Sequence, residues 1–483
     1  MKMNQSTDAQ IKRRPSYLQL ADQIQQGIYS GTYKPGEKLP SIRVLQRRLN
    51  KSVTTITSAF AELERRGLVE SRPRSGYFTC APVSVDHPEP EVFDPEPCRI
   101  LQGAMTRAVE AASLTEALVP LGGAILDEKL LPLESIRRAV RQVAREQMGE
   151  GLSYGPAAGA RQMRRMLAQQ PWGFLEPPGM DTFIMTNGGM EAISLCLRAI
   201  TRPGDAVVVE SPTFYGFLQS IEQLGLYAVE VPMDPERGMD PADLERALED
   251  RRVKAVVSIP TFQNPTGATI PEENRRAIVE LITRRQVPFI EDNIYGDLHY
   301  GGQRHTPLKA LDREGWVLYC SSFSKVMGPG LRVGFCMPGP RFFDQILALK
   351  MGTSLTSSQL TQLTVANLLT GGCYSRQVGR LRRDLASNMQ RLRHAVEAQF
   401  PAGTRMTRPQ GGFTLWVELP EGADGVALYE EALEAGIAIV PGSVCSASGR
   451  YRNCIRLSAG ALWSARIADA IEQLGRMVAK QIC

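Results

Sequence analysis

The residues with the clearest chemical potential lie at 321–325, Ser-Ser-Phe-Ser-Lys, at the end of an apolar run. The apolar run predicts a buried strand, so Lys325 lies just beyond the end of that strand. A lysine that is partly desolvated or close to other cations loses its proton more easily and can form a Schiff base with a carbonyl. Ser322, Ser324 and Arg332 offer donors and a fixed charge for a phosphate. Together they indicate pyridoxal phosphate, whereas the lysine by itself would suit a polar surface loop.

Further polar and aromatic residues follow earlier apolar runs, where they would meet the same ligand. A two-glycine turn leaves the backbone N–H groups of Gly189 and Met190 for a phosphate at a helix N-terminus. Phe214 offers a ring that can stack on a pyridine, and Asn264 can donate to a phenolic oxygen. Asp292 ends a buried run, where a carboxylate needs a cation such as a protonated pyridine nitrogen. Taken singly, the glycines would equally suit a plain turn, Phe214 would suit core packing, and Asp292 would suit a helix cap.

The elements that would position these residues form an α/β body. Seven short apolar runs alternate with helical stretches, which predicts a mostly parallel seven-stranded sheet covered by helices. In such sheets the ligand lies beyond the carboxyl ends of the strands. A long arginine-rich helical region and two short strands after about residue 340 predict a small C-terminal subdomain, whose arginines suit a solvated face or a DNA contact. The seven runs are 183–185, 206–209, 227–231, 255–259, 289–290, 317–319 and 333–336.

The first 80 residues form a basic head. They hold 14 Lys and Arg against 6 Asp and Glu, whereas the remainder holds 42 against 45. A basic head on a near-neutral body suggests contact with a polyanion. Three helical patterns, one of them capped by Ser41, and a two-stranded hairpin predict a winged helix-turn-helix. A helical protein-interaction module is the alternative.

Candidate DNA contacts lie on the second helix, the third helix and the hairpin. Hydroxyl groups on the early face of the third helix can contact phosphates or base edges. Arginines on the second helix and the hairpin would neutralise phosphates. The candidates are Ser41, Arg43, Thr54, Thr55, Thr57, Arg72 and Gly76.

Composition and spacing set the outer limits. With 483 residues the chain needs two or three domains: the head at 1–80, a proline-rich acidic linker at 81–112 and the body at 113–483. The chain has no apolar run long enough to span a membrane, and its polar N-terminus lacks a signal-peptide core. The nine scattered cysteines suggest reduced thiols in a cytoplasmic protein with no metal site.

The chain resembles known families along almost its whole length. Residues 17–21, 31–43, 54–67 and 75–78 resemble the GntR-type DNA-binding domain, which implies contact with DNA at Arg43, Thr54, Thr55 and Gly76. The body, from 154–159 to Arg456, resembles a fold-type I aminotransferase. The combination resembles the MocR family of bacterial regulators.

The aminotransferase resemblance implies a role for each residue around the cofactor. Lys325 would be the Schiff-base lysine, and Asp292 would pair with the pyridine nitrogen. Asn264 and Tyr295 would contact the ring oxygen. Phe214 would stack on the ring, where many relatives have tyrosine.

The resemblance also implies a phosphate site, a carboxylate site and a dimer. Arg456 would clamp a substrate carboxylate, and Tyr154 would reach the neighbouring subunit's site in a homodimer. Met190 stands where a polar residue is common, so only its backbone N–H is useful. The phosphate would be held by Gly189, Met190, Ser322, Ser324 and Arg332.

The combination predicts a pyridoxal-phosphate-dependent regulator that binds double-stranded operator DNA at the bacterial nucleoid. It would sense an amine or amino acid through aldimine exchange at Lys325, which changes the relation of the two heads. Two alternatives are an active aminotransferase that retains a DNA-binding head and a sensor of pyridoxal phosphate itself. Arg456 argues against the second, because a pure cofactor sensor needs no carboxylate clamp.

Overall fold

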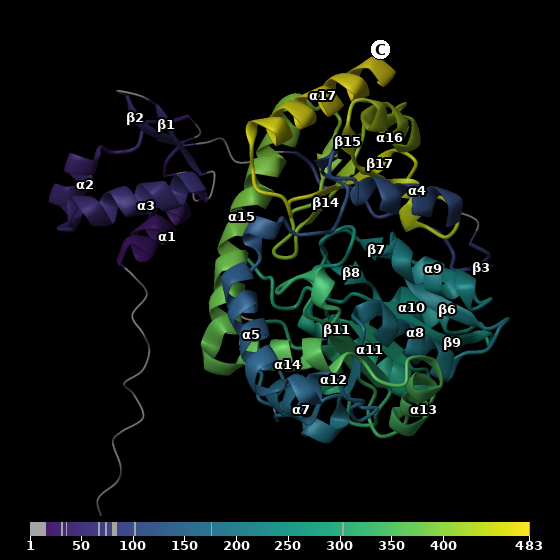
Figure 1. Ribbon diagram of the computed structural model, residues 1–483. Coiled ribbons are helices and arrows are strands. Elements are labelled where there is room, and N and C mark those ends of the chain that lie inside the picture. The colour runs from purple at the N-terminus through teal and green to yellow at the C-terminus, as the bar shows by residue number, and fades with distance from the viewer. Residues whose placement is uncertain are drawn as a thin grey trace, which may run out of the picture. The chain divides into compact units, whose positions relative to one another are not determined.

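The computed structural model divides into two compact units, residues 1–84 and 85–483, each of which is considered by itself (Figure 1). The first unit is the head of the sequence analysis, and the second is the body with the chain segment that precedes it. The structure describes residues 16–29, 32–34, 36–65, 68–72, 75–79, 85–100, 103–174, 176–301 and 304–482.

The head is the predicted winged helix-turn-helix. Leu45 of α2 and Phe60 of α3 are buried in one apolar core with residues of α1. Tyr77 of the hairpin stacks on Phe60, with ring centroids 4.3 Å apart, so the hairpin is packed onto the third helix. The elements are α1 (Ser16–Tyr29), α2 (Ile42–Leu49), α3 (Val53–Arg65) and the antiparallel strands β1 (Val69–Arg72) and β2 (Gly76–Thr79).

The body is built on a nine-stranded sheet that contains all seven predicted strands. Their order across the sheet is β7-β6-β9-β10-β11-β12-β5, and β3 and β8 each pair with β7. β6, β7, β9, β10 and β11 are parallel, and β12 is antiparallel to both of its neighbours. The strands are β3 (Pro97–Cys98), β5 (Ile184–Thr186), β6 (Ala206–Ser211), β7 (Tyr227–Asp234), β8 (Gly238–Met239), β9 (Val253–Ser258), β10 (Phe289–Asp292), β11 (Val317–Ser322) and β12 (Gly334–Met337).

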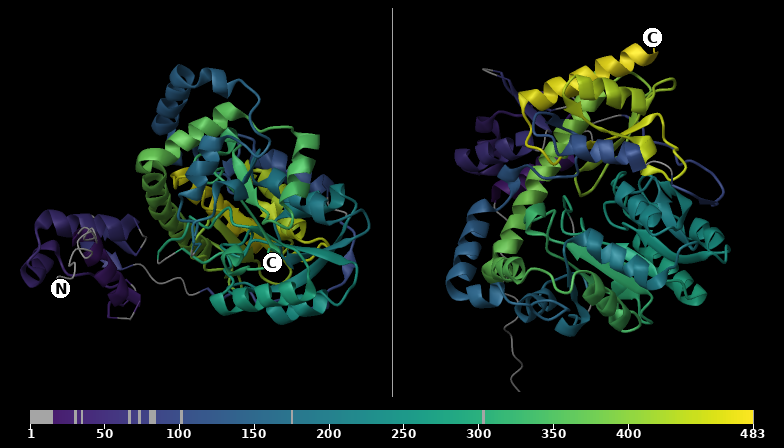
Figure 2. Two further views of the ribbon diagram at one scale, coloured as in Figure 1. Left: turned by 90° about the horizontal axis from the view of Figure 1, so that it is seen from below. Right: turned by 45° about the vertical axis from the view of Figure 1, so that its right-hand side comes forward.

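Helices surround this sheet, because its strands are continuous apolar runs that must be covered (Figures 1 and 2). One buried core cluster of this sheet is mostly aliphatic, with Phe289 and Trp316 among its members. The helices before the C-terminal part are α4 (Gly103–Ser113), α5 (Leu133–Glu146), α6 (Met148–Gly151), α7 (Arg161–Ala168), α8 (Gly189–Ile200), α9 (Tyr215–Gln223), α10 (Pro241–Ala247), α11 (Glu272–Arg285), α12 (Leu308–Leu311), α13 (Phe343–Thr353) and α14 (Gln359–Leu369).

The C-terminal part forms a second, four-stranded sheet in the order β13-β14-β17-β16. The long helix α15 leads to it and packs against α17 (Figure 2). A separate parallel pair joins β15 to β4, far earlier in the chain. These elements are β4 (Val119–Pro120), β13 (Arg405–Met406), β14 (Thr414–Glu418), β15 (Ile437–Ala438), β16 (Val440–Pro441), β17 (Cys454–Ser458), α15 (Cys373–Gln399), α16 (Gly425–Glu434) and α17 (Ala465–Ile482).

Two expected boundaries differ from the structure. The small subdomain was expected from about residue 340, but α13 packs against α8 and α14 packs against α5 and α7, so both belong with the large sheet. The linker over 81–112 was expected to begin as an extended, semi-stiff tether over 81–99, followed by a helix from about residue 100 that already belongs to the body. From residue 85 it lies in the compact body, where β3 pairs with β7, because its prolines and acidic residues find partners there. Residues 81–84 lie outside the described residues.

Within the described ranges, no helix has both the length and the hydropathy needed to cross a membrane. The same ranges hold no group of three or more histidine, cysteine or acidic side chains suited to a metal ion.

Candidate functional site

Lys325 lies three residues beyond β11, in the turn toward β12. Its Nζ donates a hydrogen bond to the backbone oxygen of Ala124, 2.6 Å away. Burial and the positive charges of Arg456 and Arg332 lower the pKa of the Lys325 amine to about 8, against the opposing charge of Asp292. An amine with this pKa is partly unprotonated near neutral pH, which is the form that attacks a carbonyl carbon.

Asp292 is the last residue of β10, the strand beside β11. Its side chain is buried, and its Oδ1 accepts a hydrogen bond from the backbone N–H of Ile294, 3.1 Å away. Burial raises the pKa of the Asp292 carboxyl to about 7, while the Ile294 bond and the charge of Lys325 oppose the rise. A buried carboxylate gains from a cationic partner, and a protonated pyridine nitrogen would supply one.

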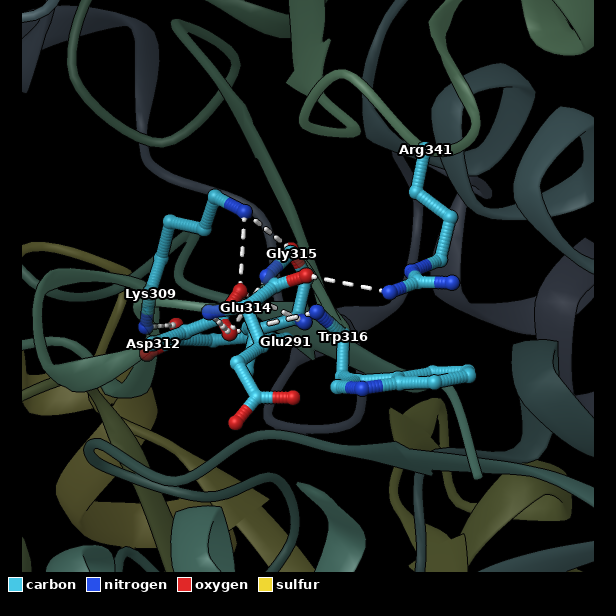
Figure 3. A network of polar contacts seen from close by, with 8 residues as sticks. Glu291, Lys309, Asp312, Glu314, Gly315, Trp316 and Arg341 are labelled. Carbon is cyan, nitrogen blue, oxygen red and sulfur yellow. Dashed lines mark hydrogen bonds and ion pairs between the residues drawn. The ribbon is translucent and has the colours of Figure 1, made fainter. Parts of the chain in front are cut away.

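The neighbouring carboxylate, Glu291, has a structural role instead (Figure 3). It accepts hydrogen bonds from the backbone N–H groups of Leu308 and Lys309, at 3.0 and 2.9 Å. Lys309 Nζ in turn lies 3.1 Å from Asp312 Oδ2, which accepts the backbone N–H of Val317, the first residue of β11. The network therefore fixes β10 and β11, the two strands that carry the aspartate and the lysine of the site.

Arg456, in β17, is fully buried and faces residues from distant parts of the chain. Its Nη1 donates to Asn264 Oδ1 over 2.9 Å and its Nη2 donates to the backbone oxygen of Gly122 over 2.5 Å. The guanidinium lies 5.6 Å from the centroid of the Tyr215 ring. Tyr295 is buried nearby; burial raises the pKa of its hydroxyl, against the charge of Arg456. The geometry thus brings three predicted residues, Asn264, Tyr295 and Arg456, together.

Gly188, Gly189, Ser322 and Arg332 form a cradle at the N-terminus of α8. Arg332 Nη2 donates to the backbone oxygen of Asn187 over 2.7 Å. A Cβ atom on Gly188 would lie 2.6 Å from the same Nη2, and Gly188 has a φ of 88°. A Cβ atom on Gly189 would lie 3.9 Å from Ser322 Oγ. Arg332 and Ser322 therefore both lie next to the start of α8. Only the absence of a side chain at Gly188 and Gly189 leaves room beside them.

Met190 and Ser324 complete this cradle. The N–H groups of Gly189 and Met190 lie in the first turn of α8, where the helix itself supplies no acceptor. The backbone N–H of Ser324 donates to Ser322 Oγ over 3.3 Å. Positive charge, hydroxyl groups and orphan N–H groups at one point fit a phosphate, so the residues present fit pyridoxal phosphate.

For two further predicted residues, Tyr154 and Phe214, the structure shows the surroundings but no bond to these groups. Tyr154 is 86% exposed, so in a single chain it makes no part of a buried site. Phe214 precedes α9, and its ring packs on Tyr215 and Phe217 at centroid distances of 5.0 and 5.6 Å.

Three residues that touch the site were not predicted from the sequence: Ala124, Gly122 and Tyr215. Ala124 and Gly122 act through backbone oxygens, which leave no trace in side-chain type. The glycine pair at 122–123 is the only signal that a close approach occurs there. Tyr215 was passed over for its neighbour Phe214, because sequence alone does not say which of two adjacent rings faces the arginine.

On the head, Ser41 caps α2 and Arg43 is exposed on it. Ser41 Oγ accepts the backbone N–H of Val44 over 3.4 Å, as a helix cap does. On α3, Thr54 is exposed. The hydroxyl of Thr55 is 2.8 Å from Ser52 Oγ, and Thr57 Oγ1 donates to the backbone oxygen of Val53 over 3.0 Å. Thr54 is thus the threonine with the fewest intrahelical ties.

In the hairpin, Arg72 differs from expectation. Its guanidinium lies 2.6 Å from Glu70 Oε1 and 4.3 Å from the centroid of the Phe78 ring. Residues two apart in a strand share a face, so the acidic neighbour competes with a DNA phosphate for this arginine. Gly76 has a φ of 104°, which only glycine adopts readily, so its place at the turn is set by the backbone.

Comparison with known proteins follows the division into two units. The family described as bacterial regulatory proteins, gntR family, matches residues 16–79. The family described as aminotransferase class I and II matches residues 122–474, well over half of the chain.

Relatives and solved structures match either the whole chain or the body. The HTH-type transcriptional regulator YjiR of Escherichia coli is 34% identical over 96% of this chain and 98% of its own length. The structure of LysN, an alpha-aminoadipate aminotransferase from Thermus thermophilus complexed with N-(5'-phosphopyridoxyl)-L-leucine, covers 80% of this chain and 96% of its own at 32% identity and a TM-score of 0.73. A kynurenine aminotransferase from Pyrococcus horikoshii covers 79% and 95% at 28% identity and a TM-score of 0.74.

Proposed function

The chain belongs to the MocR-type regulators, which join a GntR-type DNA-binding domain to an aminotransferase-like domain, and we propose that it regulates transcription in response to an amine or amino acid bound at Lys325. The head binds DNA, and the body is of the kind that uses pyridoxal phosphate. One observation carries the proposal: a site with a low-pKa lysine, a buried aspartate and a buried arginine lies on the same chain as a DNA-binding head. Operator binding would place the protein on the bacterial chromosome.

Each residue of the site would contact a different part of the cofactor. Asp292 would face the pyridine nitrogen, Asn264 and Tyr295 the ring oxygen, and Phe214 one face of the ring. The cradle at the start of α8 would hold the phosphate through Gly189, Met190, Ser322, Ser324 and Arg332. The assignment is supported by the contacts among Asn264, Tyr295 and Arg456 and by the approach of Ser322 and Arg332 to the start of α8.

Pyridoxal phosphate, when bound, supplies an electrophilic carbon for which the Lys325 amine and the amine of an effector compete. Lys325 can enter this competition because burial and nearby cations lower its pKa to about 8. Once displaced, its amine can take up a proton, with the backbone oxygen of Ala124 as acceptor. Arg456 would bind an effector carboxylate, and its Nε has no hydrogen-bond partner among the described residues.

We also propose a homodimer in which Tyr154 reaches the partner's site. Tyr154 and the nearby Leu152 are 86% and 75% exposed, so both side chains are open to a partner subunit. Two heads in one dimer would bind two operator half-sites, so a change in their relation would change affinity. Light scattering of the purified chain should give the mass of a dimer. Tyr154→Ala should weaken the binding of pyridoxal phosphate if Tyr154 reaches the partner's site.

The route from site to head would run through residues 85–98, which we call the strap. The strap is bonded to the four-stranded sheet: the backbone oxygen of Asp86 accepts the N–H of Met406 over 3.0 Å, and Glu89 lies 3.2 Å from Arg405. It is also bonded to the large sheet, where β3 pairs with β7. A shift between the two sheets would therefore move the strap, and the head's chain enters the body at the strap.

An active aminotransferase is the second candidate, because the lysine, the aspartate and the arginine are all in place. One experiment separates the two. Purified protein loaded with pyridoxal phosphate is exposed to a panel of amines and amino acids, and its near-visible spectrum, keto-acid production and binding to its own upstream DNA are followed together. A regulator shows spectral change and altered DNA binding with no steady keto-acid output. A steady output with unchanged DNA binding overturns the proposal.

A further inference from the structure

Glu210 is a fully buried carboxylate at the carboxyl end of β6 that the proposed chemistry does not use. It is held by hydrogen-bond donors: Ser258 Oγ at 2.5 Å, the backbone N–H of Ile259 at 3.2 Å and Gln263 Nε2 at 3.2 Å. A buried carboxylate is costly, and the chain keeps one here between two turns that carry cofactor-facing residues.

Gln263 connects Glu210 to both turns. Its Nε2 donates to Glu210 and also to the backbone oxygen of Pro212 over 2.8 Å. Its Oε1 accepts from the backbone N–H and from the hydroxyl of Thr266, at 2.9 and 2.8 Å. Both donor positions and both acceptor positions of the amide are therefore used, so the amide cannot rotate without losing bonds.

The positions of these residues in the chain give the network its consequence. Pro212 lies two residues before Phe214, and Gln263 directly precedes Asn264. Asn264 Oδ1 in turn accepts from Arg456. A rotation of Gln263 would therefore displace the turn that carries Phe214. It would also displace Asn264, whose amide oxygen accepts from Arg456.

We propose that Glu210 is a positioning residue of the cofactor site, which fixes the turn of Phe214 against the turn of Asn264 through Gln263. The inference rests on the proposed pyridoxal phosphate site. Glu210 touches neither cofactor nor effector and acts through its neighbours.

The charge of Glu210 also acts on the site. Burial raises the pKa of the Asp292 carboxyl, and the Glu210 charge adds to that rise. Burial raises the pKa of Glu210 itself to about 7, against its three hydrogen bonds, so it is largely ionised above neutral pH. A neutral residue at this place would remove a buried negative charge close to the cofactor's cationic groups.

Two substitutions at Glu210 separate the network from the charge. Glu210→Gln can keep the network: its oxygen can accept from Ile259 and Gln263, and its NH2 can donate to Ser258, whose hydroxyl can accept. Glu210→Ala removes both the network and the charge. Both variants are made in the full-length protein. Titration with pyridoxal phosphate measures the affinity for the cofactor. A pH titration of the near-visible absorbance band then measures the effect of the Glu210 charge.

The proposal expects Glu210→Ala to weaken pyridoxal phosphate binding at least about tenfold and Glu210→Gln by less than about threefold. Both variants should also lower the pH at which the near-visible band is half changed, by about half a pH unit. The reason is that the cationic group of the bound cofactor loses a nearby negative charge, so it gives up its proton more easily. A residue that only stabilises the fold would leave the Glu210→Gln midpoint at the wild-type value.

Gln263→Met keeps the experiment decisive if Glu210→Ala does not fold, because it cuts the bridge while Ser258 and Ile259 still bond the carboxylate. It is expected to weaken binding like Glu210→Ala, with the wild-type charge retained. Wild-type affinity in Glu210→Ala or Gln263→Met overturns the inference. If the wild-type protein itself binds no pyridoxal phosphate, the proposed function fails first.

Discussion

The head and the body present their ligand-facing residues in opposite ways. On the head, Arg43 and Thr54 are exposed on two neighbouring helices. In the body, Asp292 is 4% exposed and Arg456 is 0% exposed. The head thus meets its ligand with solvated charges on adjacent elements, and the body with desolvated charges gathered from distant ones.

This difference determines which solution variable should control each unit. Solvated charges that meet a polyanion are screened by salt, so DNA binding by the head should fall steeply as salt rises. Desolvated groups have shifted pKa values, so events in the body should depend on pH.

The largest effect is expected from removing the buried amine of the body. Lys325→Ala should lose the near-visible band of bound pyridoxal phosphate completely, because no other amine occupies its place. DNA binding without any effector should persist, since the head is a separate unit. Absorbance and a DNA-binding assay on one sample measure both.

Lys350→Met is the matched control for that experiment. Lys350 is also a buried lysine whose pKa burial lowers, but its Nζ donates to Ser357 Oγ over 2.8 Å. This variant should keep the band. A band that survives Lys325→Ala, or vanishes in Lys350→Met alone, would contradict the assignment of the cofactor lysine.

The next effect is a pH dependence confined to the body. The rate at which cofactor-free protein captures pyridoxal phosphate should rise about tenfold per pH unit below pH 8 and level off above it, because only the unprotonated Lys325 amine attacks. Arg456→Gln should move the midpoint upward, since Arg456 lowers the pKa of Lys325. A wild-type midpoint near 10.5, the ordinary value of a lysine, would refute the account.

A smaller effect is expected on the head, from a single phosphate contact. Arg43→Ala should weaken operator binding roughly fivefold per head at about 0.15 M salt and reduce the slope of log affinity against log salt by about 0.9. Arg72→Ala should do less, because Glu70 already pairs with Arg72. Fluorescence anisotropy over a salt series measures both, and equal losses would show that the pairing with Glu70 does not matter.

The smallest effect is expected where the two units are coupled. Arg405→Ala removes the bond to Glu89 of the strap, and it should reduce the effect of an active amine on operator affinity by about threefold. Arg452→Ala is the control, since Arg452, just before β17, pairs with Asp424 at the start of α16 at 2.6 Å, and its described side-chain bonds go to Asp424 and not to the strap. An unchanged response in Arg405→Ala would exclude the strap as the route.

The sequence predicted the fold where structure is local or apolar. All seven strands of the large sheet that are longer than two residues were found, because strands buried on both faces are continuous apolar runs. The two-residue strand β3 was missed, since two residues carry no period, and its neighbours were taken for a free linker. The orientation of β12, antiparallel to β11, was also beyond a pattern that marks strands without their direction.

The sequence predicted the site residues that come directly after a strand. Asp292 and Lys325 each come just after an apolar run, so their shared edge of the sheet follows from topology. The contact of Arg456 with Asn264 joins residues 192 positions apart, and the backbone oxygen of Gly122 is 334 positions from Arg456. Such pairs are set by tertiary packing alone. The pairing of Arg72 with Glu70, by contrast, was within reach of the strand period.

The central claim is that the bond between Lys325 and its cofactor controls the affinity of the head for DNA. Borohydride reduction of the loaded protein makes that bond permanent, so no amine can displace the lysine. Operator affinity is then measured with and without an amine that alters the spectrum of unreduced protein. The account predicts that unreduced protein changes its affinity and reduced protein does not. An equal response before and after reduction would contradict it.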